Sequence, residues 1–254
     1  MKLIVRADDL GFTDAVNHGI HKAIIDGIVT STGLMPNMPD AENGFNLVKK
    51  YDQISIGQHT NICVGKPCSD PNKIPSMVDQ YGNFHSSKEF RIAYKEEREI
   101  IEFEDVVTEV QAQLDKFREI TGKDPEYFEG HAIQSKNFEK ALKYVADKNN
   151  LLYVPFGVDI IPKINCKMGK FPKMSSDNLY NPLNYFLDDE GEVLDSDLAL
   201  IVTHPGYVDE DLLEISSFTM IRPLEVKALT SIEIKNWIKA NNIQLVNFHS
   251  FKYL

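Results

Sequence analysis

The sequence predicts an α/β fold in which strands and helices alternate around a parallel sheet or barrel, within a single domain covering residues 1–254. Three observations predict it. Short apolar runs typical of strands are followed by patterns of helical spacing along most of the chain. The length of 254 residues lies within the range of one α/β barrel. The hydrophobic content of 43% is enough for a substantial core.

The first half of the chain shows this alternation most clearly. Apolar, β-prone runs predict strands at residues 2–5, 28–35, 54–59 and 127–131. Apolar residues at helical spacing predict helices at residues 14–27, 40–51, 88–104, 105–122 and 137–149. Asp14 and Asp105 are the expected N-caps of the first and fourth helices. The long loop at residues 60–80 has turn signals, and we expect it to form one wall of a substrate cleft.

The second half is less regular. A continuous apolar run predicts a strand at residues 151–156, whereas residues 162–185 give no assignable pattern. Residues 198–203 form the most hydrophobic strand of the chain. Two helices at 222–229 and 231–241 and a closing strand at 244–248 complete the expected fold.

Composition points to a cytoplasmic protein. The net charge of -11 argues against nucleic acid or an anionic membrane as the main partner. The three cysteines, Cys63, Cys68 and Cys166, are odd in number and include no Cys-x-x-Cys pair, which fits a reducing compartment. The first residues run directly into a charged strand rather than a signal-peptide core, and no uncharged apolar run has the length of a membrane span.

Two adjacent carboxylates follow the first predicted strand. Asp8 and Asp9 stand where this strand ends, two residues before Gly11. Side chains of neighbouring strand residues point to opposite faces, but where the backbone turns both can reach one pocket. One carboxylate could then hold a metal while the other handles protons. The alternative is that the two acidic residues open a loop and cap a helix.

Three histidines end other predicted strands. His59, His131 and His204 each stand at a strand's carboxyl end, and in a parallel barrel these ends share the face that carries the active site. A single such histidine is more often a core or loop residue. Three of them, together with the carboxylate pair, indicate a site. His18 and His21 are expected on the surface of the first helix instead.

This set of side chains suits metal-assisted hydrolysis. Two imidazoles and one carboxylate leave open positions on a divalent ion for water and substrate. The ion acidifies the water and polarises a carbonyl oxygen. A second carboxylate can remove the water's proton, and a further histidine can protonate the leaving group or stabilise the oxyanion. The pattern predicts hydrolysis of an amide or ester without naming the substrate.

Four fragments of the sequence resemble, in the same order, the signatures of the YdjC-like carbohydrate deacetylases, which include the chitooligosaccharide deacetylases. They are Ala7-Asp8-Asp9-Leu10-Gly11, Gly57-Gln58-His59 with Asn61, Glu129-Gly130-His131, and His204-Pro205-Gly206-Tyr207-Val208-Asp209. The resemblance spans almost the whole chain and extends to Arg222 and Glu225.

The resemblance implies a deformed (β/α) TIM-like barrel related to the polysaccharide deacetylases, one bound Mg²⁺ or Zn²⁺ ion, and a possible homodimer. It also implies removal of acetyl groups from N-acetylated amino sugars or oligosaccharides, by attack of a metal-bound water on the amide carbonyl. By position, Asp9, His59 and His131 match the metal ligands of the family. Asp8 matches the proton-abstracting aspartate and His204 the second catalytic group. Arg222 matches a position near the substrate, with a helix-end salt bridge as the alternative.

The sequence departs from the family pattern around His131. The family usually has an aspartate before this histidine and further histidines two and four residues after it. Here Glu129 replaces the aspartate, and Ile133 and Ser135 occupy the later positions. The missing histidines would have lined the sugar site, so the departure bears on substrate identity more than on metal binding. The longer side chain of Glu129 could loosen the orientation of a ligand.

Two other functions stay open at this point. A phosphoesterase on a similar barrel would carry more metal ligands, so the number of metals bound per chain separates it from a deacetylase. A sugar-binding or regulatory protein on a decayed deacetylase scaffold would bind N-acetylated sugars without releasing acetate.

Overall fold

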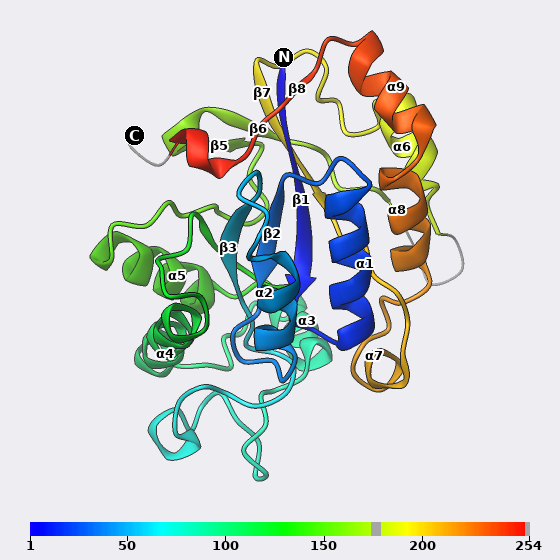
Figure 1. The fold of residues 1–254 in the computed structure, drawn as a ribbon. Helices are drawn as coiled ribbons and strands as arrows, with labels where there is room; N and C mark the ends of the chain where they lie inside the picture. Colours follow the sequence, from blue (N-terminus) through cyan, green and yellow to red (C-terminus); the bar gives the residue numbers. More distant parts are fainter. Residues whose placement is uncertain (174–178, 252–254) are drawn as a thin grey trace.

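A curled, mostly parallel sheet forms the centre of the molecule in the computed structural model, which describes residues 1–173 and 179–251 (Figure 1). The strands are β1 (Lys2–Leu10), β2 (Ser31–Leu34), β3 (Ser55–Thr60), β4 (Phe128–Gly130), β5 (Ile160–Ile161), β6 (Cys166–Met168), β7 (Leu198–Thr203) and β8 (Gln244–Leu245). Their order is β4-β3-β2-β1-β7-β6-β5, and β8 pairs with the beginning of β1. All pairs are parallel except β5 with β6. Across the described ranges the sheet curls without closing, so the fold is a deformed, open form of the expected barrel.

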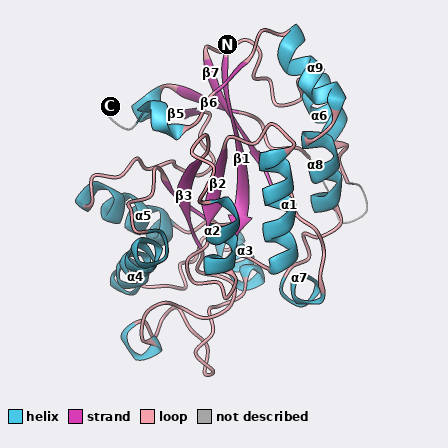
Figure 2. Cartoon of the chain, viewed as in Figure 1, coloured by secondary structure: helices cyan, strands magenta, loops and turns pink. Residues whose placement is uncertain are grey.

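Helices cover the outside of this sheet (Figure 2). Six of them are α1 (Asp14–Ile25), α2 (Ala41–Val48), α4 (Phe103–Thr121), α5 (Lys136–Lys148), α8 (Ile221–Leu229) and α9 (Ile232–Ala240), with the short α6 (Pro182–Leu187) beside the last two. Two others, α3 (Ser87–Lys95) and α7 (Glu210–Ile215), lie at the end of the molecule toward which the β1 arrow points (Figure 1). Short 3₁₀ turns occupy Pro71–Lys73, Pro162–Ile164 and Phe248–Phe251. Among the described residues, no helix combines the length and the apolar character that a bilayer crossing requires.

The central strand β1 divides its side chains between two cores. Leu3 and Val5 pack in the largest apolar cluster, which joins the sheet to α1, α2 and α9. Ile4 points to the other face and packs with Tyr127 and Phe248. This alternation buries β1 on both faces, as expected for the central strand of a parallel sheet. A separate cluster lies under α4 and α5 and includes apolar residues of the loop after β3.

The expected helix caps are wrong by one and by three residues. Thr13, not Asp14, is the N-cap of α1, and its hydroxyl accepts a hydrogen bond from the Val16 N–H. The helix α4 begins at Phe103, so Asp105 lies in its first turn. There the Asp105 carboxylate accepts hydrogen bonds from the backbone N–H and hydroxyl of Ser76. It therefore ties the long loop to α4.

Several expected elements are shorter than predicted. Residues 151–156 form only one bridge, between Tyr153 and Phe128. The helix expected at 88–104 ends at Lys95, shortly before Glu97 takes a positive φ of 54°. The closing strand stops at Leu245 and is followed by a 3₁₀ turn. The unassigned stretch 162–185 contains β6 and the first residues of α6, and its residues 174–178 lie outside the described part.

Candidate metal centre and active site

The site residues predicted from the sequence lie at the carboxyl ends of four strands. Asp8 and Asp9 belong to β1, His59 to β3, and His131 and His204 follow β4 and β7 directly. Asp9, His59 and His131 converge, since each offers one donor atom and these atoms all lie within 4.8 Å of one another. Of the two helical histidines, His18 is exposed as expected, while His21 is half-buried.

A bulge brings both aspartates to the same site. Arg6 and Asp8 follow the strand alternation and face the same side of β1. By that alternation Asp9 would face the opposite side. The register between β1 and β2 shifts between Ala7 and Leu10, and Asp9 adopts a φ of +73°. This positive φ is unusual for an aspartate and turns its side chain toward the histidines. The two carboxylates therefore meet inside β1, which continues to Leu10, and not at the strand terminus as expected.

The three converging side chains make a set of donors suited to a divalent ion. Asp9 Oδ1 lies 3.1 Å from His59 Nε2 and 3.1 Å from His131 Nδ1. The two imidazole nitrogens are 2.9 Å apart. Asp9 and His59 are almost fully buried, whereas the side chain of His131 is 12% exposed. Two imidazoles and one carboxylate, open to solvent on the His131 side, fit a zinc or magnesium site with free positions.

Glu129 orients His59 within this cluster. Its carboxylate accepts a hydrogen bond from His59 Nδ1, which leaves the lone pair on Nε2 for an ion. Gly33 of β2 makes room for the pair, because a Cβ there would lie 3.0 Å from the His59 Cβ and 3.4 Å from Glu129 Oε1. The carboxylate before His131 therefore supports a histidine from the neighbouring strand.

Arg222 holds the other oxygen of Asp9. Its Nη2 donates to Asp9 Oδ2 at 2.7 Å, and its Nε donates to the Phe218 carbonyl at 2.7 Å. The guanidinium also stacks over Phe12 and Phe218. Burial works to raise the pKa of Asp9, but the charge of Arg222 and the contact with His131 outweigh it and keep the pKa well below its usual value. Of the two interpretations of Arg222, the structure shows the salt bridge, and a substrate contact stays a prediction.

A second arginine, which was not among the predicted site residues, holds Asp8. Arg6 Nη2 donates to Asp8 Oδ2 at 2.7 Å, and Arg6 Nε lies 2.7 Å from Asp8 Oδ1. The same Nη2 is 3.5 Å from Glu129 Oε2. Because residues two apart on a strand share a face, the spacing of Arg6 and Asp8 was the available signal. Asp8 is thus fixed beside the cluster.

His204 lies in an apolar setting. Its ring meets Phe171 and Phe218 edge-on, with centroid distances of 5.8 and 5.1 Å. Burial lowers the pKa of His204 to about 4, although the negative charges of Asp9 and Asp8 act in the opposite direction. No protein atom of the described residues accepts from or donates to its Nδ1. His204 is therefore a neutral imidazole at pH 7, within electrostatic reach of both aspartates.

Glu225 fixes the backbone of His204. One carboxylate oxygen accepts the His204 N–H, and the other accepts the Tyr180 hydroxyl. The side chain is buried, and burial raises its pKa to about 7 even though both hydrogen bonds favour the charged form. The sequence marked Glu225 only as part of the family resemblance, and the unassigned stretch 162–185 gave no signal for Tyr180.

The residues after His204 dock this wall of the site onto α1. Gly19 and Gly206 touch so closely that a Cβ on Gly19 would lie 2.4 Å from the Gly206 Cα. Tyr207 N–H donates to the Ala15 carbonyl, and Asp209 Oδ2 accepts the Ala15 N–H at 3.0 Å. The His-Pro-Gly-Tyr-Val-Asp motif therefore combines His204 with the residues that position its loop.

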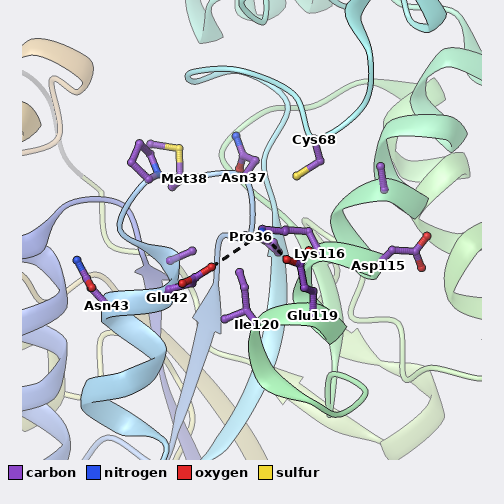
Figure 3. Close-up of a pocket in the computed structure, with 13 residues that line it drawn as sticks. Pro36, Asn37, Met38, Glu42, Asn43, Cys68, Asp115, Lys116, Glu119 and Ile120 are labelled. Atoms are coloured by element: carbon purple, nitrogen blue, oxygen red, sulfur yellow. Dashed lines mark hydrogen bonds and ion pairs between the residues drawn. The ribbon is translucent and has the colours of Figure 1, made fainter.

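A groove of about 810 Å³ lies elsewhere, between α2 and α4 (Figure 3). None of the predicted site residues lines it. Its lysine, Lys116, lies 3.1 Å from Glu119 and 3.9 Å from Glu42, so that its charge is already balanced. The groove therefore lies apart from the buried cluster at the strand ends and contains none of its donor side chains.

Comparison with known proteins agrees with the resemblance read from the sequence. The family model described as "YdjC-like protein" matches residues 2–240. Carbohydrate deacetylase 2 of Listeria innocua is 31% identical over 258 residues, covering 98% of each chain. The carbohydrate deacetylase of Clostridium beijerinckii is 32% identical over 256 residues, covering 98% of this chain and 99% of the relative.

Solved structures extend the comparison to the fold. An Enterococcus faecalis protein, provisionally named a cellobiose-phosphate cleavage protein, superposes with a TM-score of 0.83 at 26% identity and 98% coverage of both chains. A CE4 family pseudoenzyme mutant with restored enzymatic activity superposes with a TM-score of 0.50 at 10% identity, covering 99% of this chain and 67% of that one, a likeness in fold alone. On the strength of the family match and the two bacterial relatives, the chain belongs to the YdjC-like protein family.

Proposed function

We propose that this protein is a metal-dependent carbohydrate deacetylase, a hydrolase that removes acetyl groups from N-acetylated amino sugars or oligosaccharides. The observation that carries the proposal is the convergence of Asp9, His59 and His131 on one point beside a second carboxylate. The two bacterial relatives named above as carbohydrate deacetylases support the choice of substrate.

Asp9, His59 and His131 are the residues that hold the ion in this proposal, and Mg²⁺ and Zn²⁺ are both compatible with the donor set. When bound, a divalent ion lowers the pKa of water and polarises the amide carbonyl. The chain's own contribution is to present one carboxylate oxygen and two imidazole nitrogens with their lone pairs free. Arg222 keeps Asp9 ionised for this purpose, and Glu129 keeps His59 in the required tautomer.

Asp8 and His204 handle the proton and the developing charge. Asp8 accepts the proton of the attacking water and later returns it to the leaving nitrogen. Arg6 fixes the direction of the Asp8 carboxylate, since it contacts both of its oxygens. His204 is neutral at pH 7, which suits a hydrogen-bond donor to the carbonyl oxygen better than a strong acid. Arg222 acts indirectly, by holding Asp9, unless the sugar contacts its guanidinium.

We also propose that residues 1–254 act as one domain and that the protein works in the cytoplasm as a homodimer. Its partner in this proposal is a small carbohydrate and neither nucleic acid nor membrane, which the net charge of -11 supports.

The test is acetate release from a panel of N-acetylated sugars by protein reconstituted with Zn²⁺ or Mg²⁺. We expect release with the wild-type protein. Asp8→Asn should keep its metal but lose turnover by about 10²–10⁴-fold, because the proton acceptor is gone. Asp52→Asn changes an exposed aspartate and serves as the matched control.

Three outcomes would contradict the proposal. Sugar binding without acetate release would indicate a binding protein, and release of phosphate from sugar phosphates instead of acetate would indicate a phosphoesterase. Full activity and normal metal content in Asp8→Asn would remove Asp8 from the mechanism.

A further inference from the structure

Two side chains that follow His131 are used by the fold. Ile133 is buried in the apolar cluster under α4 and α5. The Ser135 hydroxyl accepts the Phe138 N–H at the beginning of α5 and donates to Glu99 Oε2 at 2.7 Å. Because both side chains are buried and engaged, contacts that recognise a sugar ring have to come from other residues around the site.

The β7 side of the site carries an exposed aromatic ring next to His204. Phe171 is 54% exposed, and its ring lies 5.8 Å from that of His204 at an interplanar angle of 84°. It belongs to none of the three apolar clusters formed by the described residues. Single exposed apolar side chains are common on proteins, so exposure alone assigns no role. The position beside the proposed catalytic histidine is what points to the substrate.

The backbone on both sides of Phe171 is held in place. The Lys170 N–H donates to the Gly191 carbonyl at 3.0 Å, and the Lys170 carbonyl accepts the Tyr185 hydroxyl at 2.7 Å. On the other side, Pro172 is buried, and its ring fixes its own φ. A side chain on such an anchored backbone loses little conformational entropy when it binds a ligand.

Phe218 gives His204 a second apolar neighbour. Its ring lies 5.1 Å from the imidazole, and its carbonyl accepts the Arg222 Nε–H at 2.7 Å. A pyranose ring suits an aromatic side chain in this position. Its equatorial substituents point outward and leave C–H groups on its faces, and the negative face of an aromatic ring attracts such groups.

We propose that Phe171 is a stacking platform for a pyranose ring of the substrate. This inference rests on the proposed function and adds a specificity-determining residue to it. Phe171 recognises the cyclic sugar by apolar contact, and the site therefore favours N-acetylated pyranose sugars over acyclic N-acetyl compounds. Phe171 contributes to substrate binding and not to the chemical step.

The test measures KM and kcat for acetate release by zinc-loaded protein. The substrate is the pyranose sugar that the wild type deacetylates fastest, starting from di-N-acetylchitobiose. Phe171→Ala should raise KM by about 5–30-fold, as expected for the loss of one apolar ring contact, and leave kcat within about two-fold. Phe171→Trp restores a flat ring and should recover the affinity. Tyr144→Ala removes an exposed ring from α5 and is the matched control.

Phe171→Leu separates ring stacking from apolar bulk, because it keeps an apolar side chain without a flat face. We expect its KM to resemble that of Phe171→Ala. Calorimetric titration of the same sugar into zinc-loaded Asp8→Asn, with and without Phe171→Ala, should show the same factor in Kd.

Three results would overturn the inference while leaving deacetylation in place. They are a wild-type KM in Phe171→Ala or Phe171→Leu, a fall in kcat at unchanged KM, and faster deacetylation of acyclic N-acetyl compounds than of pyranose sugars by the wild type. A fall in kcat alone would mean that Phe171 acts through His204. Failure of the wild-type protein to release acetate from any compound would instead contradict the proposed function.

Discussion

The two walls of the site hold their polar side chains in opposite environments. On the β1–β3–β4 wall, each charged side chain has a partner of opposite charge: Asp9 pairs with Arg222, and Asp8 with Arg6. On the β7 wall, His204 lies between two phenylalanines and stays neutral, because its pKa is lowered to about 4. One wall therefore contains paired, fixed charges, and the other presents a neutral, half-buried imidazole. Substitutions on the two walls should therefore have different effects on metal content and activity.

The largest effect is expected on the charged wall. His59→Ala removes a donor at the centre of the cluster, so that both metal content and activity should be lost. Loss of the several kcal/mol that an ion supplies corresponds to a fall of about a thousand-fold or more in kcat/KM. The measurements are metal analysis and acetate release, with His18→Ala at an exposed position of α1 as the control. Retention of both by His59→Ala would refute the ligand assignment.

A change on the apolar wall should leave the metal in place. His204→Gln keeps a hydrogen-bonding side chain but removes the imidazole, and we expect kcat to fall by about 10²–10³-fold with unchanged metal content. Measuring kcat and bound metal on the same preparation checks this. Loss of metal from His204→Gln would mean that the two walls are not separate in function.

A smaller effect is expected where a carboxylate supports a ligand. Glu129→Gln removes the charge that orients His59, and such changes weaken metal affinity by about 10–100-fold. With excess metal, kcat should return close to the wild-type value. Measuring activity during a metal titration separates metal affinity from kcat. Glu139→Gln, which changes an exposed glutamate of α5, provides the comparison. A loss of kcat that excess metal does not restore would assign Glu129 a role in the reaction itself.

The smallest expected effect is on stability rather than on turnover. Burial raises the pKa of Glu225 from 4.5 to about 7, so its neutral form stabilises the fold fully below pH 4.5, and this contribution is lost as the pH rises through 7. Glu225→Gln imitates the neutral acid at every pH. It should match the wild type at pH 5 and exceed it at pH 8 by on the order of 3 kcal/mol, or several degrees in the thermal midpoint.

Thermal melts of the wild type and Glu225→Gln between pH 5 and pH 8 test the sign of this pH dependence of stability. An advantage of Glu225→Gln that is larger at pH 5 than at pH 8 would contradict the burial of a neutral Glu225. The neutral His204 makes the opposite contribution, since its stabilisation is lost as the pH falls from 6.5 toward 4. The wild-type protein should therefore show weak pH dependence between these limits, and the variant a steeper loss on acidification.

The sequence could predict that Asp8, Asp9 and the three histidines reach the site because each stands at or near the carboxyl end of a strand, and the ends of parallel strands meet. It could not predict how they are held. The partner of Asp9 is Arg222, 213 positions away, and hydropathy patterns report only neighbours along the chain. The bulge that turns Asp9 toward the histidines is a property of backbone register, which residue types alone do not determine.

The same limit explains the errors in the fold. Short strands were overestimated where an apolar run extends beyond the pairing, as at residues 151–156, which form a single bridge through Tyr153. Elements without an apolar pattern, such as β6 and α6, were missed because packing against the remainder of the chain creates them. Long amphipathic helices, by contrast, were found within a few residues, since their spacing is a local signal.

The most direct test of the central claim is to locate the ion by anomalous diffraction from crystals of the metal-loaded protein. We predict one peak within about 2.0–2.2 Å of Asp9, His59 and His131 donor atoms for Zn²⁺. A peak held by Asp8 and Glu129, or an ion bound away from His59, would contradict the account.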